Sequence, residues 1–404
     1  MSIEIRVCGP EDMPRALAPI FHYFGQTPDE EAMDRFGPIL PPDRVHAAFD
    51  NGEIVGSGGI FPFETSVPGG GFVRAAGVTL VGVLPTHRRR GVFKRLMEAQ
   101  LEDAHERGEP MAYLWASDDK LYGRFGYGIA SFTASVDVRL DRSVFHTDFE
   151  VRGRFRPVDV EQAIASFSPI QRRAAEEHPG MFVRTPEWWR SKRLADPKSV
   201  REGGGEMVRM LLELDGRPAG YALYRLHWAA EQGVPTGFIK VIEAVGDSPE
   251  ATRELWRFLL DTDWMDRAKA QLLPRDHELL LLVAEPRRLN FAFRDGLWVR
   301  LVDVEPALNA RKYQPGEPVV LEVQDELCPW NAGRWRVDPD GAERTDAEAE
   351  LALPVTSLGS AYLGGFRFGE LAQAGRLEEL ADGAIDRADA LFRADRYPWC
   401  PEIF

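Results

Sequence analysis

One segment, residues 75–105, constrains the fold of this chain more than any other. An apolar run at 75–83 is followed by Pro85, by three consecutive arginines at 88–90, by Gly91, and then by apolar residues at helical spacing. This order predicts a β-strand, a tight basic turn and an amphipathic helix. The first N–H groups of a helix have no intrahelical partner and lie at its electropositive end, so the turn is typical of an anion-binding site.

The strand before the turn restricts which anion can bind. The backbone of Val81, Gly82 and Val83 can pair with an extended ligand that contains amide groups, as the edge of a sheet does. Coenzyme A has a pyrophosphate at one end and amides in its arm, so we expect it here, with the Val83 amide polarising a thioester carbonyl. The residues expected to hold the pyrophosphate are Arg88, Arg89, Arg90, Gly91, Val92, Phe93 and Lys94. The alternative is a basic turn that only faces solvent.

A second strand, predicted at 111–115, ends in a polar segment that contains a tyrosine. If the two strands are neighbours in the sheet, Ser117 and Asp118 lie beside the end of the first strand and complete the coenzyme site. Tyr122 follows one helical turn later, where its phenol could protonate a departing thiolate. The alternative for Tyr122 is a half-buried side chain that closes a small core.

A chain of 404 residues exceeds one ordinary core, so its length predicts two or three domains. The order of the predicted elements divides the chain at 1–150, 151–296 and 297–404. In the first domain, the order strand, helix, hairpin, strand, helix, strand predicts an α+β layer with one crossover. The hairpin is marked by Asn51-Gly52.

The middle part of the chain repeats the order hairpin, strand, helix, strand. The turn before its helix, at 246–249, is acidic and has no arginines, which indicates a degenerate copy that keeps the core and has lost the anion site. The strand after that helix is predicted at 279–283. Strands at 132–140 and 298–304 are assigned to the first and last domains.

Charge and composition exclude several classes of protein. A net charge of −15 disfavours nucleic-acid binding and favours cationic partners. The three cysteines and eight histidines show no metal-ligand spacing, so we expect no metal and no disulfide framework. The first residues do not resemble a signal peptide and no apolar run reaches membrane-spanning length, so we expect a cytoplasmic protein without a membrane span.

Two motifs resemble those of GCN5-related N-acetyltransferases (GNAT). Residues 81–91 are similar to the coenzyme-A motif, in which Arg88 and Gly91 fit the pattern and Phe93 replaces a small residue. Residues 121–127 are similar to the tyrosine segment of the same family, which implies that Tyr122 is the general acid.

The whole chain resembles the Eis (enhanced intracellular survival) subfamily. The residues that carry this resemblance are Pro85-Thr-His-Arg-Arg-Arg-Gly91, Tyr122-Gly-Arg-Phe-Gly-Tyr127, Arg184-Thr-Pro-Glu-Trp-Trp-Arg190 and the terminal phenylalanine. The resemblance implies a catalytic GNAT domain, a degenerate GNAT-like domain and a C-terminal α+β domain like a sterol carrier protein. It also implies acetyl-CoA as the donor and a homohexamer as the assembly.

In that subfamily the terminal carboxylate is the general base, which implies this role for Phe404. An α-carboxyl group has an ordinary pKa of about 3.5 and is ionised at neutral pH. The tail at 397–404 is aromatic and stiffened by proline, unlike a frayed terminus; the alternative is a tail that only docks. Glu402 is expected to add negative charge to an amine pocket, and Phe24 to form part of its wall; the alternatives are a solvated glutamate and a core phenylalanine.

The expected function is therefore transfer of an acetyl group from acetyl-CoA to primary amines of a polycationic substrate such as an aminoglycoside. Two alternatives stay open. A narrow amine pocket would favour an acetyltransferase for lysines of proteins or peptides. A long apolar cavity in the last domain, with Tyr122 far from the cofactor, would favour a scaffold that binds coenzyme A or lipid without catalysis.

Overall fold

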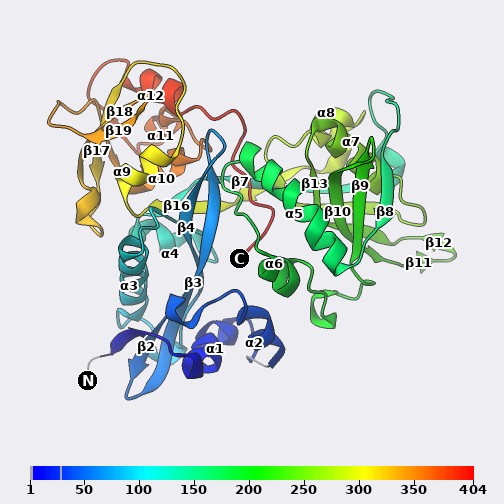
Figure 1. Ribbon diagram of the computed structural model, residues 1–404, viewed down its shortest axis with the longest axis horizontal. Helices are drawn as coiled ribbons and strands as arrows, with labels where there is room; N and C mark the ends of the chain where they lie inside the picture. Colours follow the sequence, from blue (N-terminus) through cyan, green and yellow to red (C-terminus); the bar gives the residue numbers. More distant parts are fainter. Residues whose placement is uncertain (1–2, 28–29) are drawn as a thin grey trace. The chain divides into compact units, whose positions relative to one another are not determined.

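The computed structural model describes residues 3–27 and 30–404, and its elements fall into two compact units (Figure 1). The first unit contains the chain up to Ser131, residues 296–398 and residues 403–404. The second unit contains residues 132–295 and 399–402. Each unit is therefore assembled from segments that are far apart in the sequence.

A seven-stranded sheet forms the centre of the first unit. Its strands in spatial order are β1 (Glu4–Val7), β2 (Val45–Asp50), β3 (Glu53–Val67), β4 (Gly71–Val83), β5 (Met111–Trp115), β16 (Leu297–Leu301) and β6 (Gly128–Ile129). β2 and β3 form the predicted hairpin, in which Asn51 and Gly52 both adopt positive φ, 54° and 84°. β4 and β5 are parallel, and α3 (Val92–Glu106) is the crossover between them.

The two long helices of this unit cover opposite faces of the sheet. Ser57 of β3 donates a hydrogen bond from Oγ to the carbonyl of Ala16 in α1 (Met13–Tyr23). The next residue, Gly58, faces the side chain of Gln100 in α3. Because successive residues of a strand point to opposite faces, α1 and α3 must lie on different sides. Two shorter helices complete this part, α2 (Glu30–Phe36) and α4 (Asp119–Tyr122).

The second unit repeats the arrangement of the first. The strands of its sheet, in spatial order, are β15 (Ala292–Asp295), β7 (Phe132–Arg139), β14 (Arg267–Pro274), β13 (Phe238–Gly246), β10 (Arg217–His227), β9 (Val208–Leu214) and β8 (Arg154–Pro157). β9 and β10 form a hairpin, β13 and β14 are parallel, and α7 (Pro249–Leu260) connects those two strands. The copy expected from the sequence is thus present. A long helix that the sequence reading missed, α5 (Val160–Glu177), also packs on this sheet.

The C-terminal part of the first unit has its own five-stranded sheet. Its strands in spatial order are β19 (Gly341–Arg344), β18 (Gly333–Asp338), β17 (Val319–Gln324), β20 (Leu351–Pro354) and β21 (Glu378–Glu379). Its helices are α9 (Val304–Ala310), α10 (Val355–Tyr362), α11 (Phe368–Gln373) and α12 (Ala384–Phe392). The acidic stretch at 338–350 contains the hairpin between β18 and β19.

Two strands lie on the other side of the predicted domain limits. β7, expected in the first domain, pairs with β14 and β15 in the second sheet. β16, expected in the last domain, pairs with β5 in the first sheet. The local pattern of a strand predicts that it will pair but does not specify its partner, because backbone pairing is nearly independent of sequence.

The prediction of a strand at 279–283 is wrong. Leu279–Leu282 form a short helix, α8, and the strand that follows α7 is β14. A continuous apolar run has no periodicity that separates a strand from a buried helical turn. The backbone N–H of Leu279 donates to Nδ1 of His277, which stabilises the start of α8.

Candidate active site

The parallel strands β4 and β5 are paired over only three residues. Gly77 and Tyr113 are the last partners of this ladder. Beyond them, a bulge in β4 places Leu80 and Val81 opposite the single residue Gly58 of β3, and Leu80 has φ 55°. The last part of β4 therefore separates from β5 and presents a backbone edge, as the sequence predicted for the arm of an extended ligand.

The peptide groups of Val83 point into this separation. Leu84 donates its N–H to the carbonyl of Val55, so the preceding pair, Gly56 and Val83, is of the non-hydrogen-bonded type and directs its peptide groups away from β3. The carbonyl of Val83 accepts a hydrogen bond from the Tyr23 hydroxyl at 2.5 Å. The N–H of Val83 lies on the same side, where a thioester oxygen could accept it.

Gly82 allows α1 to approach the end of β4. A Cβ atom at Gly82 would lie 2.8 Å from the backbone nitrogen of Ile20 in α1. The predicted contribution of Gly82 to a coenzyme site can therefore come only from its backbone, since helix α1 covers the position of a side chain.

Helix α3 begins without a capping side chain. Its N-cap residue is Gly91, which has φ 79° and ψ 2°. A Cβ atom at Gly91 would meet no heavy atom of the described residues within 4 Å, so the left-handed backbone is what favours glycine here. The N–H groups of the first turn are thus left for an external anion.

The three arginines of the turn are exposed and partly held by neighbours. Nε of Arg88 donates to the Tyr23 hydroxyl at 2.8 Å, and Arg90 lies 3.6 Å from the Asp50 carboxylate. Arg89 has φ 59°. Tyr23 thus joins the end of β4 to the arginine turn, a role that was not predicted from the sequence.

The side chains of the next residues face the core. Val92 is buried with Val83 and Leu96, and Phe93 packs against Tyr122 with ring centroids 6.0 Å apart. Only the backbone of Val92 and Phe93 can therefore meet an anion. Lys94 remains exposed and lies 3.5 Å from Glu98 one turn along α3. Through Phe93, the first turn of α3 and Tyr122 belong to one cluster.

Tyr122 has the properties of a proton donor at neutral pH. Its side chain is 5% exposed, and burial raises the pKa of its phenol, an effect that a hydrogen bond with Ser117 opposes. Asp118 adds a smaller upward contribution to this pKa and uses its carboxylate to cap α4, accepting from the N–H of Lys120 at 3.0 Å. Ser117 and Asp118 are thus placed beside Tyr122, and their expected part in the coenzyme site stays a prediction.

The end of the chain is packed inside the first unit. Phe404 is 8% exposed, and its ring meets Phe63 and Tyr113 edge-on at centroid distances of 5.0 and 4.9 Å. The hydroxyl of Tyr113 lies 2.7 Å from Oγ1 of Thr65. Since Tyr113 is the last residue of β5 that pairs with β4, the terminus is held where the two strands separate.

The two predicted substrate residues have different environments. Phe24 is 63% exposed at the end of α1, so it is not a core residue. Glu402 is 4% exposed and belongs to the second unit, where its carboxylate accepts hydrogen bonds from Arg184 and Trp188. Glu402 is therefore not the solvated glutamate of the alternative, because its carboxylate is buried and paired with Arg184. Its expected role in an amine pocket stays a prediction.

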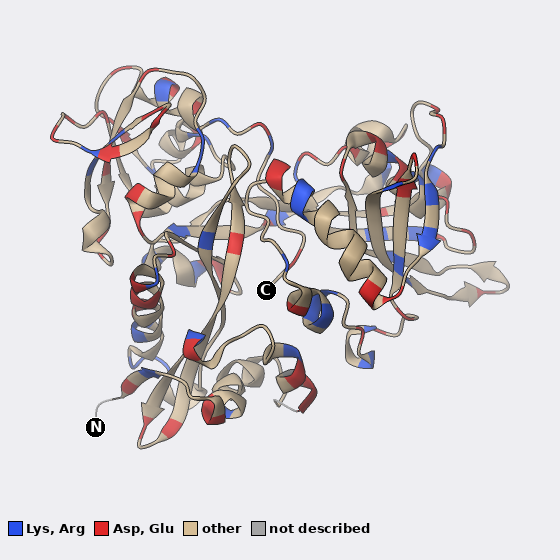
Figure 2. Cartoon of the chain, in the orientation of Figure 1, with Lys and Arg blue, Asp and Glu red and all other residues tan. Residues whose placement is uncertain are grey.

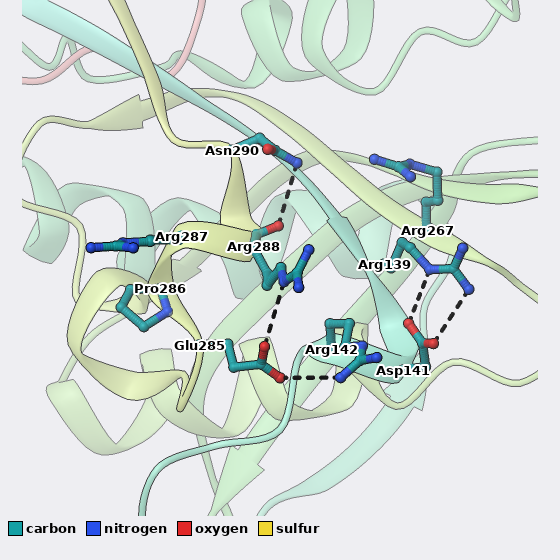
Figure 3. A pocket seen from close by; sticks show the side chains of 9 residues that line it. All are labelled: Arg139, Asp141, Arg142, Arg267, Glu285, Pro286, Arg287, Arg288 and Asn290. Carbon is teal, nitrogen blue, oxygen red and sulfur yellow. Dashed lines mark hydrogen bonds and ion pairs between the residues drawn. The ribbon is translucent and has the colours of Figure 1, made fainter.

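A separate hollow of about 980 Å³ in the second unit contains none of the predicted site residues (Figure 3). Its lining residues are Arg139, Asp141, Arg142, Arg267, Glu285, Pro286, Arg287, Arg288 and Asn290. Most of these arginines pair with carboxylates: Arg139 lies 3.1 Å from Asp141, and Arg288 lies 3.5 Å from Glu285. The hollow is an exposed network of ion pairs and contains no nucleophile.

The equivalent turn of the second unit has no anion site. Ser248 caps α7 by accepting a hydrogen bond from the N–H of Ala251, and Asp247 accepts from Arg173 and Arg217 at 2.8 and 2.6 Å. This helix start is closed and acidic, which agrees with the interpretation of a degenerate copy. Within residues 3–27 and 30–404, no helix is long and apolar enough to cross a bilayer, and no cluster of three or more His, Cys, Asp or Glu residues is suited to a metal ion.

Comparison with known proteins extends these observations over the whole chain. Residues 4–130 and 180–301 each match a family described as an acetyltransferase (GNAT) domain, and residues 304–401 match the sterol carrier protein domain. An uncharacterized N-acetyltransferase of Streptomyces coelicolor is 40% identical over 417 residues, with 100% of both chains covered. N-acetyltransferase Eis of Mycobacterium tuberculosis is 34% identical over 355 residues, which cover 85% of this chain and 84% of that protein.

A solved structure shows the same architecture. The crystal structure of Eis1 from Mycobacterium abscessus has a TM-score of 0.86 and 35% sequence identity, with 100% of both chains covered. The predicted fold class is confirmed: two GNAT domains are followed by a sterol-carrier-like domain in an α+β chain.

Proposed function

The chain belongs to the Eis-like GCN5-related N-acetyltransferases, and we propose that it transfers the acetyl group of acetyl-CoA to primary amines of a polycationic substrate such as an aminoglycoside. The observation that carries the proposal is the separation of β4 and β5 beyond Gly77 and Tyr113. There, the edge of β4, the uncapped start of α3 and the buried chain end belong to one unit.

The described residues fit acetyl-CoA. The N–H groups at 91–94 and the exposed arginines at 88–90 would hold its pyrophosphate, and the backbone of 81–83 would hold its arm. Acetyl-CoA supplies the thioester whose acetyl group is transferred. The Val83 N–H would donate to the thioester oxygen and so stabilise the charge that develops there.

Two groups of the chain would move protons. A lysine-like amine has a pKa of about 10.4 and must lose a proton before it can attack. The α-carboxylate of Phe404 takes this proton, directly or through a water molecule. Tyr122 gives its proton to the departing sulfur, since burial keeps its phenol protonated at neutral pH.

The substrate class is supported by the net charge of −15, which attracts polycations. Acidic and basic residues are interspersed along the chain (Figure 2), so this attraction is diffuse.

The proposal includes a catalytic domain at 1–150, a degenerate domain at 151–296 and a sterol-carrier-like domain at 297–404, with β7 and β16 exchanged between sheets. It also includes a cytoplasmic homohexamer; the three buried free cysteines suit a reducing compartment.

Steady-state acetylation of an aminoglycoside, a polyamine and a peptide with a single lysine tests this proposal. We expect the highest kcat/KM with the aminoglycoside; a preference for the peptide would favour the lysine acetyltransferase instead. A chain extended by one alanine beyond Phe404 should bind acetyl-CoA with unchanged affinity in calorimetry but lose turnover. The reason is that the Phe404 carboxylate, the proposed base, is converted into a peptide carbonyl. Full turnover of the extended chain would contradict the role of the terminus, and failure to bind acetyl-CoA at about 1 mM would contradict the whole proposal.

A further inference from the structure

The last residues of the chain leave the first unit for a short stretch. Residues 399–402 belong to the second unit, whereas 403–404 belong to the first. In the second unit, Oε2 of Glu402 accepts from Nε of Arg184 at 2.8 Å and from Nε1 of Trp188 at 3.0 Å. The side chains of Arg184 and Glu402 are 1% and 5% exposed, so this pair is inside the protein.

Arg184 holds Glu402 as part of a larger ionic cluster. Its Nη1 and Nη2 atoms donate to the two carboxylate oxygens of Glu243 at 2.7 and 2.6 Å. Arg193 also donates to Glu243, and the Tyr221 hydroxyl does so at 2.5 Å. Two arginines and two glutamates thus balance each other, and without Glu402 the cluster would carry an uncompensated buried positive charge.

The cluster lies where the parallel strands of the degenerate copy separate. The ladder of β13 and β14 ends at Val241 and Ala270, as the ladder of β4 and β5 ends at Gly77 and Tyr113. Glu243 follows on β13 beyond that point. In the catalytic copy, the equivalent separation is the proposed binding site for the arm of acetyl-CoA.

The chain end is hydrogen-bonded directly to β14 and is linked to β13 through the side chain of Arg193. Nε1 of Trp399 donates to the carbonyl of Leu272 in β14 at 2.6 Å. Nη2 of Arg193 donates to the carbonyl of Ile242 in β13 at 3.2 Å and to that of Pro401 at 3.4 Å. The backbone N–H of Trp399 also donates to the carbonyl of Pro179 at 2.8 Å.

We propose that the separated strands of the degenerate copy bind the chain's own segment Trp399–Glu402, and that Arg184 and Trp188 are positioning residues for the carboxylate of Phe404. This inference rests on the proposed role of that carboxylate. Phe404 follows Glu402 by two residues, which span at most about 7 Å of extended chain, so an anchored Glu402 restricts where the base can lie. The copy that lost its anion site thereby acts on the reaction without binding the donor.

Two changes in the tail test the anchor in the full chain. Glu402→Gln removes the charge that Arg184 binds, and Trp399→Phe removes one hydrogen bond while it keeps most of the packing. Arg190→Met is the matched control, because Arg190 lies in the same segment as Arg184 but forms an exposed ion pair with Glu161 at 3.0 Å. The first measurement is the rate at which carboxypeptidase releases Phe404 below the melting temperature, monitored by mass spectrometry. The others are kcat and the calorimetric affinity for acetyl-CoA.

We expect both tail variants to release Phe404 faster and to lower kcat by roughly 10- to 100-fold. A loss of this size is typical when a hydrogen bond to a charged group is removed or a reacting group is displaced. Affinity for acetyl-CoA should not change in any variant, and Arg190→Met should match the wild type throughout. Unchanged release of Phe404 would overturn the anchor, and faster release with an unchanged kcat would overturn its positioning role. If the wild type acetylates no amine, the proposed function fails, while the release of Phe404 still reports on the anchor.

Discussion

Replacing Tyr122 with phenylalanine separates proton donation from packing. The change removes the hydroxyl and leaves the ring, which packs between Phe93 and Tyr127 at centroid distances of 6.0 and 6.2 Å. It also removes the hydrogen bond with Ser117, whose net contribution to stability is about 1 kcal/mol. A general acid contributes about 10²- to 10⁴-fold to the rate, so kcat should fall by that factor while the free energy of unfolding changes little.

Tyr127→Phe is the matched control for this experiment. Tyr127 is fully buried five residues further on, and among the described residues its hydroxyl has no hydrogen-bond partner. Its removal should leave kcat unchanged and raise the free energy of unfolding by about 1 kcal/mol, because an unsatisfied buried hydroxyl is lost. The assays are steady-state acetylation at saturating substrates and urea unfolding. Equal losses of kcat in both variants, or full activity of Tyr122→Phe, would refute the assignment of Tyr122 as the acid.

Three further predictions concern other parts of the chain. Gly91→Ala should cost about 1–2 kcal/mol of stability and weaken acetyl-CoA binding, because alanine disfavours φ 79°. Gly216→Ala is the control, since Gly216 has φ 77° in another turn: it should cost the same stability in thermal unfolding and leave the calorimetric affinity for acetyl-CoA unchanged. Arg300→Met should lower the free energy of unfolding by about 3–5 kcal/mol, because it leaves the Asp325 carboxylate, 2.7 Å away and 2% exposed, without its charge partner; a urea midpoint equal to the wild type would contradict this. Burial lowers the pKa of His277 to about 4, so the folded state binds fewer protons than the unfolded state below pH 6.5. The free energy of unfolding should therefore fall there by up to about 1.4 kcal/mol per pH unit. Urea titrations of His277→Asn should show a smaller fall.

Short-range patterns identified the parts of this protein that depend on neighbours in sequence. Asn51-Gly52 predicted a hairpin because both residues tolerate positive φ, and the structure has that hairpin. The arginine turn and Gly91, followed by apolar residues at helical spacing, predicted the start of a helix, and α3 begins there. α5 was missed although a local signal existed, since Asp159 and Gln162 form a capping box.

Contacts between distant residues could not be found in this way. Glu402 looked like a solvated or substrate-facing carboxylate, yet Arg184, 218 residues earlier, binds it in the interior. The exchange of β7 and β16 between sheets is of the same kind, since each strand has an ordinary alternating or apolar pattern. The role of Tyr23 was not predicted, because its hydrogen bond to Val83 spans 60 residues.

The sequence by itself determined the turn that starts α3, the repeat of its surroundings and the position of Tyr122, because backbone conformation and helix starts depend on residues a few places apart. Only the tertiary structure decided which sheet each strand joins, that Phe404 packs on Tyr113, and that Glu402 pairs with Arg184. The physical reason is that charge pairing and burial depend on distance in space, whereas a sequence pattern records only distance along the chain.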